Sequence, residues 1–311
     1  MKPLVSAVIP TYNRPQLVTR AVKSALRQTL KEIEVIVVID GPDKTTREVL
    51  ASINDSRLKV IELPIKVRGA AARNAGVAES QGEWVALLDD DDEWLPEKLA
   101  RQLKVAQQSQ FLYPIIACLH IRRTPQGDYI WPRRLPAPSE HLSEYLLARK
   151  GLFRGETAIC TPTLFFNKSL MQRMSMKEER RIHQDWDWLL RVSALEGVGI
   201  EFVPEPLSII WEHGLQETTG TIVNWRSSLD WIQPLKETGL VTPCAYAAFL
   251  MTTLGAAAAK AGDWRAFWLL LSKAVKQGKP KPIYFPLYFG MWLFPPKMRR
   301  WLRAIFTRQR H

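Results

Sequence analysis

The sequence has few cysteines and no long apolar run, and both absences narrow the class of protein. Its 311 residues contain three cysteines, Cys118, Cys160 and Cys244, which are far apart and lack the spacing of metal ligands. We expect structural thiols in a reducing compartment, with neither a disulfide nor a zinc site. The sequence also contains no run of the roughly 18 to 20 uninterrupted apolar residues that a membrane-spanning helix requires. The longest candidate, 283–294, is short and is broken by Pro286.

Acidic residues are missing from one end of the chain. From Trp264 to His311 there are eleven Lys and Arg and no Asp or Glu, so the remainder carries only +1 of the formal net charge of +12. Because nearly all of the excess positive charge lies in this segment, the overall charge does not indicate a nucleic-acid partner. At the other end the chain enters a strand-like run at once, without the charged leader and apolar core of a signal peptide. We therefore expect the catalytic part to be cytoplasmic.

The basic C-terminal segment is also rich in aromatic residues, a combination typical of amphipathic segments that lie at a membrane surface. Lys297, Arg299, Arg300 and Arg303 surround Trp301 on a short segment that follows two prolines. We expect this group to bind an anionic leaflet, which makes the protein peripheral at the cytoplasmic face of the membrane. A helical pair packed on the catalytic domain would explain the aromatic residues equally well, but it would not explain the charge.

The first hundred residues predict a parallel sheet. Short apolar runs, each followed by a polar turn and a helical segment, are typical of strands joined by crossover helices. The runs are 5–10, 35–40, 58–63 and 84–88. In such sheets the ligand binds beyond the carboxyl ends of the strands. The polar residues that follow these runs are therefore the first candidates for a functional site.

Beyond about residue 113 the pattern is looser, and we expect this half to recognise a variable substrate. The expected elements are strands at 115–122, 158–166, 199–203 and 207–211, helices at 139–149 and 185–195, and an irregular Pro-rich stretch at 125–138. The helix at 139–149 is expected to begin with a serine cap, and the strand at 158–166 to be interrupted at Pro162.

Four consecutive carboxylates, Asp89, Asp90, Asp91 and Asp92, follow the fourth strand-like run. Packing so many like charges raises the free energy of the fold unless a cation shares the site, and hard oxygen ligands of this kind suit Mg²⁺ or Mn²⁺. The run therefore predicts a metal-assisted phosphate chemistry. Alternatively the acids cap the helix that follows, where Pro96 suits the first turn. A single Asp would be enough for that.

Five segments, each a weak signal alone, occur in a characteristic order. They are Val8-Ile9-Pro10-Thr11-Tyr12-Asn13-Arg14, Val38-Ile39-Asp40, the segment 69–76, Asp89-x-Asp91-Asp92 followed by Glu93-Trp94-Leu95-Pro96, and Gln184-Asp185-Trp186-Asp187. Together they cover roughly residues 4 to 215, and the chain resembles the glycosyltransferase family 2 enzymes of GT-A fold.

The resemblance implies an α/β fold, with a mixed, mainly parallel sheet, flanking helices and a C-terminal helical extension. It implies a GT-A catalytic domain over 1–225, in which 1–112 bind a nucleotide-diphosphate sugar and 113–225 the acceptor. The basic and aromatic extension covers 226–311. The implied reaction transfers the sugar of the donor to an acceptor hydroxyl, with inversion at the anomeric carbon.

The resemblance also assigns residues to the donor site. The implied donor-binding residues are Pro10, Thr11, Tyr12, Arg14, Asp40, Arg73, Asn74, Asp89 and Asp90. Thr11, Tyr12 and Asp40 would contact the base and ribose, with Tyr12 placed to stack. The residue types Arg73 and Asn74 also suit a phosphate or the acidic run.

A divalent cation, Mg²⁺ or Mn²⁺, is carried over to Asp91. Asp89 and Asp92 could each hold the metal, the ribose or an arginine of the neighbouring helix. We take Asp92 as a second metal ligand. His213 follows a strand-like run, where GT-A enzymes often place a histidine on the metal or diphosphate. A structural histidine remains the alternative.

An inverting displacement needs a carboxylate on the far side of the sugar to take the acceptor's proton. By match to the family's Glu-Asp pair near a helix start, this base is Asp185, although Gln184 replaces the Glu and its charge is lost. Asp185 could instead cap the helix, in which case Asp187 is the next candidate. We expect Trp186 and Trp188 in the core rather than in a sugar-stacking wall.

Two other classes of protein remain open. A nucleotidyltransferase that makes a nucleotide sugar would also use acidic metal ligands. We would expect it to carry a Gly-rich loop with Lys or Arg after the first strand, where this chain has Pro10-Thr11-Tyr12-Asn13-Arg14 instead. A membrane-associated GT-A protein without catalysis would not need the acidic run or Asp185. For the enzyme, we expect a glycan or a lipid-linked acceptor, as in cell-surface polysaccharide or glycolipid synthesis.

Overall fold

The computed structural model describes residues 2–151, 156–212 and 224–294. The chain forms two compact units, Met1–Leu135 with Thr157–Thr218, and Pro136–Glu156 with Thr219–His311. The segment 136–156 was expected in the catalytic domain, but it belongs to the second unit because its helix α5 (Leu142–Leu147) packs on α9 (Pro243–Phe249). The assignment of the two halves to donor and acceptor stays a prediction. His213 and the basic group at 297–303 lie outside the described residues.

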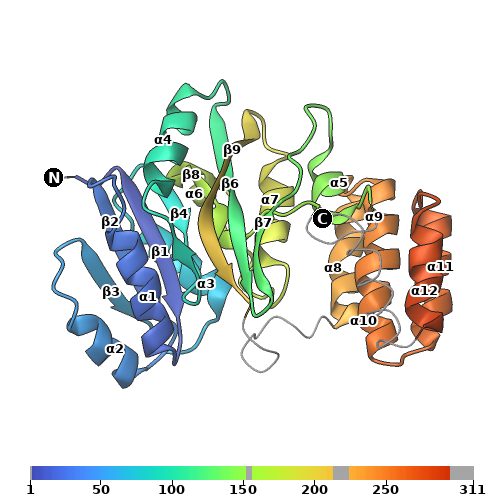
Figure 1. Cartoon of the computed structure of the whole chain (residues 1–311), viewed down its shortest axis with the longest axis horizontal. Coiled ribbons are helices and arrows are strands. Elements are labelled where there is room, and N and C mark those ends of the chain that lie inside the picture. The colour runs from blue at the N-terminus through green and yellow to red at the C-terminus, as the bar shows by residue number, and fades with distance from the viewer. Residues whose placement is uncertain (1, 152–155, 213–223, 295–311) are drawn as a thin grey trace. The chain divides into compact units, whose positions relative to one another are not determined.

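The described strands of the first unit form one mixed sheet in the order β3-β2-β1-β4-β8-β6-β9-β5, with β7 paired to β6 (Figure 1). The strands are β1 (Val5–Thr11), β2 (Ile33–Ile39), β3 (Leu58–Glu62), β4 (Trp84–Leu87), β5 (Glu93–Trp94), β6 (Tyr113–Thr124), β7 (Gly127–Trp131), β8 (Phe165–Asn167) and β9 (Val198–Trp211). Strands β1 to β4 pair in parallel, as do β6 and β9. This confirms the expected mixed, mainly parallel sheet.

Helices cover both faces of the sheet. They are α1 (Pro15–Leu26), α2 (Lys44–Ala51), α3 (Gly69–Ala78), α4 (Lys98–Gln108), α6 (Lys168–Arg173) and α7 (Gln184–Val192). Side chains of α1 and α4 share a core with one face of β1 and β2, whereas α3 packs on the other face. Small residues let α3 approach closely: a methyl group on Gly76 would lie 2.4 Å from Val8 Cγ1.

The second half of this unit departs from the expected elements. Strand β7 forms a hairpin with β6 inside the stretch expected to be irregular. The two strands expected at 199–203 and 207–211 are one strand, β9, whose pairing with β6 shifts register next to Leu119. A bulge keeps a strand continuous where its local pattern is broken. Around Pro162 the chain forms a 3₁₀ turn (Thr161–Thr163) before the short β8.

The second unit is helical. Besides α5 and α9 it contains α8 (Trp225–Glu237), a π-helical turn (Leu250–Leu254), α10 (Gly255–Lys260), α11 (Arg265–Gln277) and α12 (Tyr284–Leu293). Helix α5 begins after His141, whose imidazole accepts from Ser143 N, rather than after the expected serine. Buried tyrosines tie the helices together, as Tyr288 donates to the carbonyl of Phe267 at 2.6 Å. None of the helices described here combines the length and apolar composition needed to cross a bilayer.

Candidate active site

The run Asp89–Asp92, here called the acidic turn, follows β4 at the carboxyl edge of the parallel strands. The ends of β1 and β2 meet it there, because β4 pairs with β1 and β1 with β2. Three arginines contact the turn: Arg14 just before α1, Arg20 within α1 and Arg73 on α3. The turn and these arginines form the polar centre that the sequence predicts at this edge.

Asp90 is tied to the first strand. Its carboxylate accepts hydrogen bonds from Thr11 Oγ1 at 2.8 Å and from Arg14 Nη1 at 3.1 Å, and the same Arg14 nitrogen lies 3.0 Å from Asp91 Oδ2. Burial raises the pKa of Asp90 to about 6 in spite of these two partners. Thr11 and Arg14, both expected in the donor site, thus hold the acidic turn against β1.

Arg73 connects the acidic turn to the helix that carries Asp185. Its Nη2 pairs with Asp89 Oδ1, and its Nη1 donates to Gln184 Oε1 at 3.0 Å. We call this arrangement the Arg73 bridge. A methyl group on Gly69 would lie 2.9 Å from Arg73 Nη1 and 3.3 Å from Gln184 Oε1. The bridge therefore depends on a glycine at the start of α3.

Asp92 anchors the end of β9. Its Oδ1 accepts from the backbone N–H of Trp211 at 3.0 Å, and the Trp211 indole donates to Glu93 at 2.9 Å. The guanidinium groups of Arg20 and Arg123 lie over the Trp211 ring, 4.4 and 4.9 Å from its centroid. Burial first, then repulsion from Asp89 and Asp91, raises the pKa of Asp92 well above its usual value.

The carboxylates of the acidic turn suit a divalent cation. They supply only oxygen ligands, and with Glu93 they outnumber Arg14, Arg20 and Arg73. Burial raises the pKa of Asp89, as it does for Asp90 and Asp92. Among the described side chains, no group of three or more His, Cys, Asp or Glu forms a ready-made metal site. Mg²⁺ commonly uses one or two carboxylates and completes its shell with substrate phosphates and water, so this set fits.

Asp89 and Asp91 are the better placed ligands. Each has one oxygen on an arginine, whereas Asp92 is 4% exposed and holds the N–H of Trp211. The arrangement therefore favours Asp91 with Asp89 over the expected pair of Asp91 with Asp92. Whether His213 contributes stays a prediction.

The remaining candidates for the donor site lie around the first two strand ends. Pro10 is buried within β1, and Tyr12, just beyond it, has Lys66 Nζ 3.5 Å above the centre of its ring. Asp40 is buried and accepts from the backbone N–H groups of Val67 and Arg68. It therefore holds the loop before α3, and its contact with a donor stays a prediction.

Asn74 has a structural partner. Its amide pairs with both backbone groups of Met176, donating at 2.9 Å and accepting at 3.1 Å, and it also donates to Glu178. With these contacts Asn74 fixes the segment before α7, and neither a phosphate nor the acidic run is needed to explain it.

Asp185 and Asp187 lie in the first turn of α7 in different surroundings. Asp185 is half-buried, its Oδ1 accepts from Trp186 N at 2.9 Å, and burial raises its pKa. Asp187 is 1% exposed and lies 2.7 Å from Arg191 Nε and 3.7 Å from Arg180 Nε. A buried carboxylate paired with two arginines is not available to an acceptor hydroxyl. The geometry therefore favours Asp185 over Asp187 as a base.

The two tryptophans beside these acids also differ. Trp188 is fully buried against Phe166 and donates to the carbonyl of Met174, as expected for a core residue. Trp186 is partly exposed and stacks on His183, with ring centroids 5.7 Å apart. His183 itself has a left-handed backbone (φ 60°) directly before α7.

Sequence reasoning missed Cys160, Arg20 and Trp211. Burial raises the pKa of the Cys160 thiol, and the negative charges of Asp185 and Asp92 raise it further. Cys160 therefore lies near the proposed general base. All three cysteines are free thiols. Only the fold shows that Cys160 lies near the site, because it is far from the other site residues in the sequence. Arg20 could have been found from the sequence, since it follows the Thr-Tyr-Asn-Arg segment by less than two helical turns.

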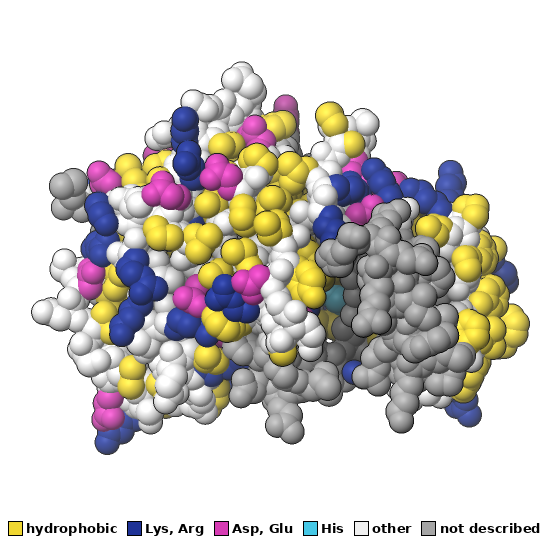
Figure 2. All heavy atoms as spheres, viewed as in Figure 1, with side chains coloured by type: hydrophobic (Ala, Val, Ile, Leu, Met, Phe, Trp, Pro, Cys, Tyr) yellow, Lys and Arg dark blue, Asp and Glu magenta, His cyan; other side chains and the backbone are white. Residues whose placement is uncertain are grey.

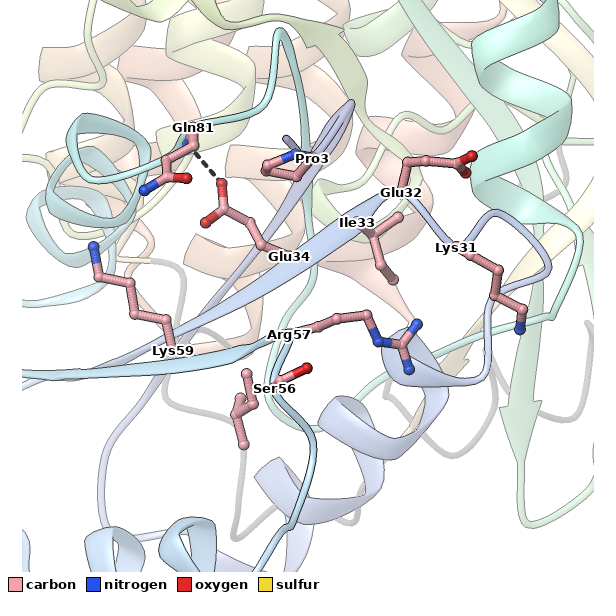
Figure 3. A pocket seen from close by; sticks show the side chains of 10 residues that line it. Pro3, Lys31, Glu32, Ile33, Glu34, Ser56, Arg57, Lys59 and Gln81 are labelled. Atoms are coloured by element: carbon pink, nitrogen blue, oxygen red, sulfur yellow. Dashed lines mark hydrogen bonds between the residues drawn. The ribbon is translucent and has the colours of Figure 1, made fainter. Parts of the chain in front are cut away.

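A cavity of about 490 Å³ lies at the opposite, amino-terminal edge of the parallel strands (Figure 3). Three of its charged side chains, Glu34, Arg57 and Lys59, have partners within the protein. Glu34 accepts from the backbone N–H of Gln81 and from Ser6 Oγ, and Arg57 binds Asp55. Lys59 pairs with Glu79. The cavity is therefore a structural recess rather than a second site.

The chain resembles known proteins in sequence and in fold. Residues 6–174 match the family model "Glycosyl transferase family 2". WcaA of Escherichia coli K12, named as a colanic acid biosynthesis glycosyl transferase, is 32% identical over 198 residues, which are 61% of this chain and 66% of WcaA. The amylovoran biosynthesis glycosyltransferase AmsB of Erwinia amylovora is 26% identical over 74% of this chain and 77% of AmsB.

A shorter match concerns an enzyme with a printed acceptor. WfaP of Escherichia coli, a UDP-Glc:α-D-GlcNAc-diphosphoundecaprenol β-1,3-glucosyltransferase, is 33% identical over 110 residues. This match covers 35% of the present chain and 44% of WfaP. The chain therefore spans under two thirds of the length of both WcaA and WfaP.

Solved structures share the fold. S. aureus TarS 1–349 in complex with UDP-GlcNAc superposes with a TM-score of 0.59 at 16% identity, covering 94% of this chain and 79% of TarS 1–349. The complex of the same protein with UDP gives a TM-score of 0.55 at 17% identity. At this identity the likeness concerns the fold.

Proposed function

The chain belongs to glycosyltransferase family 2 and has the GT-A fold, and we propose that it is an inverting glycosyltransferase. It would move a sugar from a nucleotide-diphosphate sugar to an acceptor hydroxyl. The observation that carries the proposal is the Arg73 bridge, which joins the acidic turn to the helix bearing Asp185. Through it, the groups suited to the leaving diphosphate and the group suited to the acceptor proton belong to one connected network.

On the donor side, the acidic turn and its arginines would bind the diphosphate. Asp91 and Asp89 would hold Mg²⁺ or Mn²⁺, which supplies positive charge for the phosphate oxygens as the leaving group departs. Arg14 and Arg73 already contact these carboxylates, so they are close enough to turn towards a phosphate. Tyr12, just beyond β1, would stack on the nucleotide's base.

On the acceptor side, Asp185 would remove the proton of the attacking hydroxyl. Its raised pKa makes it a better base than an exposed Asp, because basicity rises with pKa. A single carboxylate on the face opposite the leaving group is what a direct inverting displacement requires. Gln184, which takes the place of the acid expected there, accepts from Arg73 and donates to the carbonyl of Arg180. It would thus keep Asp185 in place without adding a charge.

The acceptor would be a saccharide on its way to the cell surface. Support comes from the printed names of the relatives, which concern colanic acid, amylovoran and an undecaprenol-linked saccharide. A lipid-linked acceptor of this kind would place the reaction at the cytoplasmic face of the membrane, with the enzyme peripheral to it.

Donor hydrolysis gives the most direct test. The protein is incubated with UDP-, GDP- and dTDP-sugars in Mg²⁺ or Mn²⁺, and release of the nucleoside diphosphate is measured. We expect one donor class to be hydrolysed, EDTA to stop the reaction reversibly, and Asp91→Ala to abolish it while the fold persists. Release of pyrophosphate from a nucleoside triphosphate and sugar phosphate would instead indicate a nucleotidyltransferase. Full activity in EDTA would remove the metal from the mechanism.

A further inference from the structure

The outer side of α11 and α12 is unusually apolar for a protein surface. Trp264, Trp268 and Leu269 on or next to α11 are 57%, 71% and 42% exposed, and Leu293 at the end of α12 is 66% exposed. Figure 2 shows hydrophobic side chains gathered over these two helices, with Lys and Arg at the edges of the patch. Contiguous patches of this kind mark interaction sites on soluble domains.

The exposed side chains form one continuous face. Trp264 and Trp268 both contact the buried ring of Phe267, with centroids 6.1 and 4.9 Å away, and Phe289 of α12 contacts the same ring at 5.8 Å. Val275 is 50% exposed and continues the row of Trp264 and Trp268 at helical spacing along α11. We call the exposed members of this set the α11–α12 face.

The segment that carries this face has charges of one sign. Between Trp264 and Phe294 the chain carries Arg265, Lys273, Lys276, Lys279 and Lys281 and no acidic residue. Arg265 and Lys276 are exposed next to the apolar row. Aromatic side chains together with Lys and Arg stems are the residues that settle at the boundary between lipid headgroups and acyl chains.

We propose that the α11–α12 face docks on an anionic lipid surface. The apolar row would enter the headgroup boundary while the flanking cations meet lipid phosphates, which attract Lys and Arg near such a surface. A second copy of this chain would bring the same positive charge to the face and be repelled. The segment 295–311 carries six more Lys and Arg and no acid, so it too is a poor cover for this face. The proposal does not depend on the donor chemistry proposed above.

The test is sedimentation of the full chain with vesicles of phosphatidylcholine, alone or with roughly a third of phosphatidylglycerol, at low and high salt. Trp268→Ser removes the largest exposed apolar group, and Val275→Glu puts a negative charge into the row. Leu112→Glu serves as the matched control, because Leu112 is also 71% exposed but lies in the first unit. Donor hydrolysis and thermal unfolding are measured for all variants.

We expect the wild type to bind only vesicles that contain anionic lipid, and more weakly at high salt. Trp268→Ser should weaken binding about tenfold, as the loss of one buried large apolar side chain predicts. Val275→Glu should weaken it at least as much, and Leu112→Glu should leave it unchanged. Donor hydrolysis should persist in all three variants, which separates a failed surface from a failed enzyme.

Several results would overturn the proposal. Equal binding of wild type, Trp268→Ser and Val275→Glu would show that the face does not meet the lipid, whether a second copy or the chain's own end covers it. Equal loss in Leu112→Glu would show an effect of net charge alone. If Trp268→Ser lowered the unfolding temperature, the exposed Val275→Glu would decide, because its side chain leaves the helix core untouched.

Discussion

Asp185 and Asp187 show how the surroundings of one residue decide its chemistry. They lie two positions apart on α7, and apart from the resemblance of Gln184-Asp185 to the family's Glu-Asp pair, the local sequence does not separate their roles. Asp187 is buried between Arg180 and Arg191, where its charge is needed to balance theirs. Asp185 lacks such a pairing among the described ion pairs, and burial raises its pKa. The first is suited to holding the helix in place and the second to taking a proton.

Replacing Asp185 by Asn should therefore stop the chemistry and spare the fold. Asn keeps an oxygen that can accept from Trp186 N, but it cannot take a proton, so we expect kcat to fall roughly 10²-fold or more with little change in donor affinity. In the wild type, kcat should fall as the pH drops through the raised pKa of Asp185, and this acid limb should lie above the usual range of Asp. Rates across pH and donor binding by calorimetry check both points.

The matched control is Asp187→Asn. It leaves the partly buried Arg180 and Arg191 without their charge partner, so the free energy of unfolding should drop by about 1 to 3 kcal/mol. The rate per folded molecule should change much less. Near-normal turnover in Asp185→Asn together with a large loss in stable Asp187→Asn would move the base to Asp187.

Lys98 is a buried cation in the core of the first unit. Its Nζ lies 2.6 Å from Gln102 Oε1 and 4.3 Å from the centre of the Trp94 ring, and burial lowers its pKa from 10.5 to about 8. Between these two values the unfolded chain keeps a proton that the folded protein has released. The free energy of unfolding therefore increases as the pH rises through this window. Below about pH 8 Lys98 is charged in the fold, and the buried charge destabilises the folded state by its full amount.

The variant Lys98→Met should remove this pH dependence. The variant should be more stable than the wild type at pH 7. This difference in the free energy of unfolding should shrink by about 1 kcal/mol for each pH unit above 8. Urea unfolding at pH 7, 8 and 9 measures the difference. Lys104→Met, on the exposed side of the same helix, should show no such trend. A difference between Lys98→Met and wild type that stays constant from pH 7 to 9 would mean that Lys98 keeps its proton in the fold and that burial does not lower its pKa.

At the scale of elements, helix α3 has two glycines with separate duties. A methyl group on Gly76 would lie 2.4 Å from Val8 Cγ1 and 3.0 Å from Val38 Cγ2, against the packed sheet. A methyl group on Gly69 would meet only the ends of two flexible side chains, Arg73 and Gln184. One glycine therefore allows the helix to pack, and the other allows the Arg73 bridge to form.

The pair Gly69→Ala and Gly76→Ala should separate these duties. Gly76→Ala should lower the free energy of unfolding by about 1 to 3 kcal/mol through overpacking. Gly69→Ala should leave stability unchanged or slightly higher, because Ala favours a helix, yet it should slow transfer by displacing Arg73 from Gln184. Thermal melts and initial rates measure the two effects. Loss of stability in Gly69→Ala without loss of rate would contradict a functional bridge.

The elements that could be predicted are those whose pattern is local. Strands β1 to β4 and their helices follow from apolar runs and turns in neighbouring residues, and so does the acidic turn beyond β4. Strand β7, with the sequence Gly-Asp-Tyr-Ile-Trp, was missed because Pro125 and Pro132 flank it and predict irregular structure. Its pairing with β6, which local sequence does not show, makes it a strand. The single strand β9 was divided in the prediction at Pro204 and Pro206, where the register shift in its pairing with β6 tolerates the prolines.

The same limit applies to the site. The types of residue at the acidic turn and at the start of α7 were readable from the chain. The contact between Arg73 and Gln184 was not, because the two residues are 111 positions apart. Asn74 has the residue type of a phosphate ligand, yet its amide is used by the backbone of Met176. Only the fold decides which polar side chains remain available.

At the scale of the whole molecule, positive charge is concentrated at one end. The last 48 residues carry eleven of the 43 Lys and Arg and none of the 31 Asp and Glu. Like charges gathered in one segment repel one another on a compact domain, and a negatively charged surface reduces that repulsion. The part of this segment within α11 and α12 contributes apolar contact area, whereas the part beyond it, outside the described residues, contributes most of the charge.

These two contributions should respond differently to mutation and salt. Changing Lys297, Arg299, Arg300 and Arg303 to Gln should weaken binding to anionic vesicles and flatten its salt dependence, because an anionic leaflet stabilises each nearby cation by roughly 1 kcal/mol. Trp268→Ser should weaken binding while the salt dependence stays steep. Sedimentation over a range of salt measures both slopes, with donor hydrolysis as the control for folding. If the four-residue variant bound as wild type at every salt concentration, the charge would have to act through α11 and α12 alone. If it lost stability and hydrolysis together, the segment would be a packed part of the fold instead of a membrane contact.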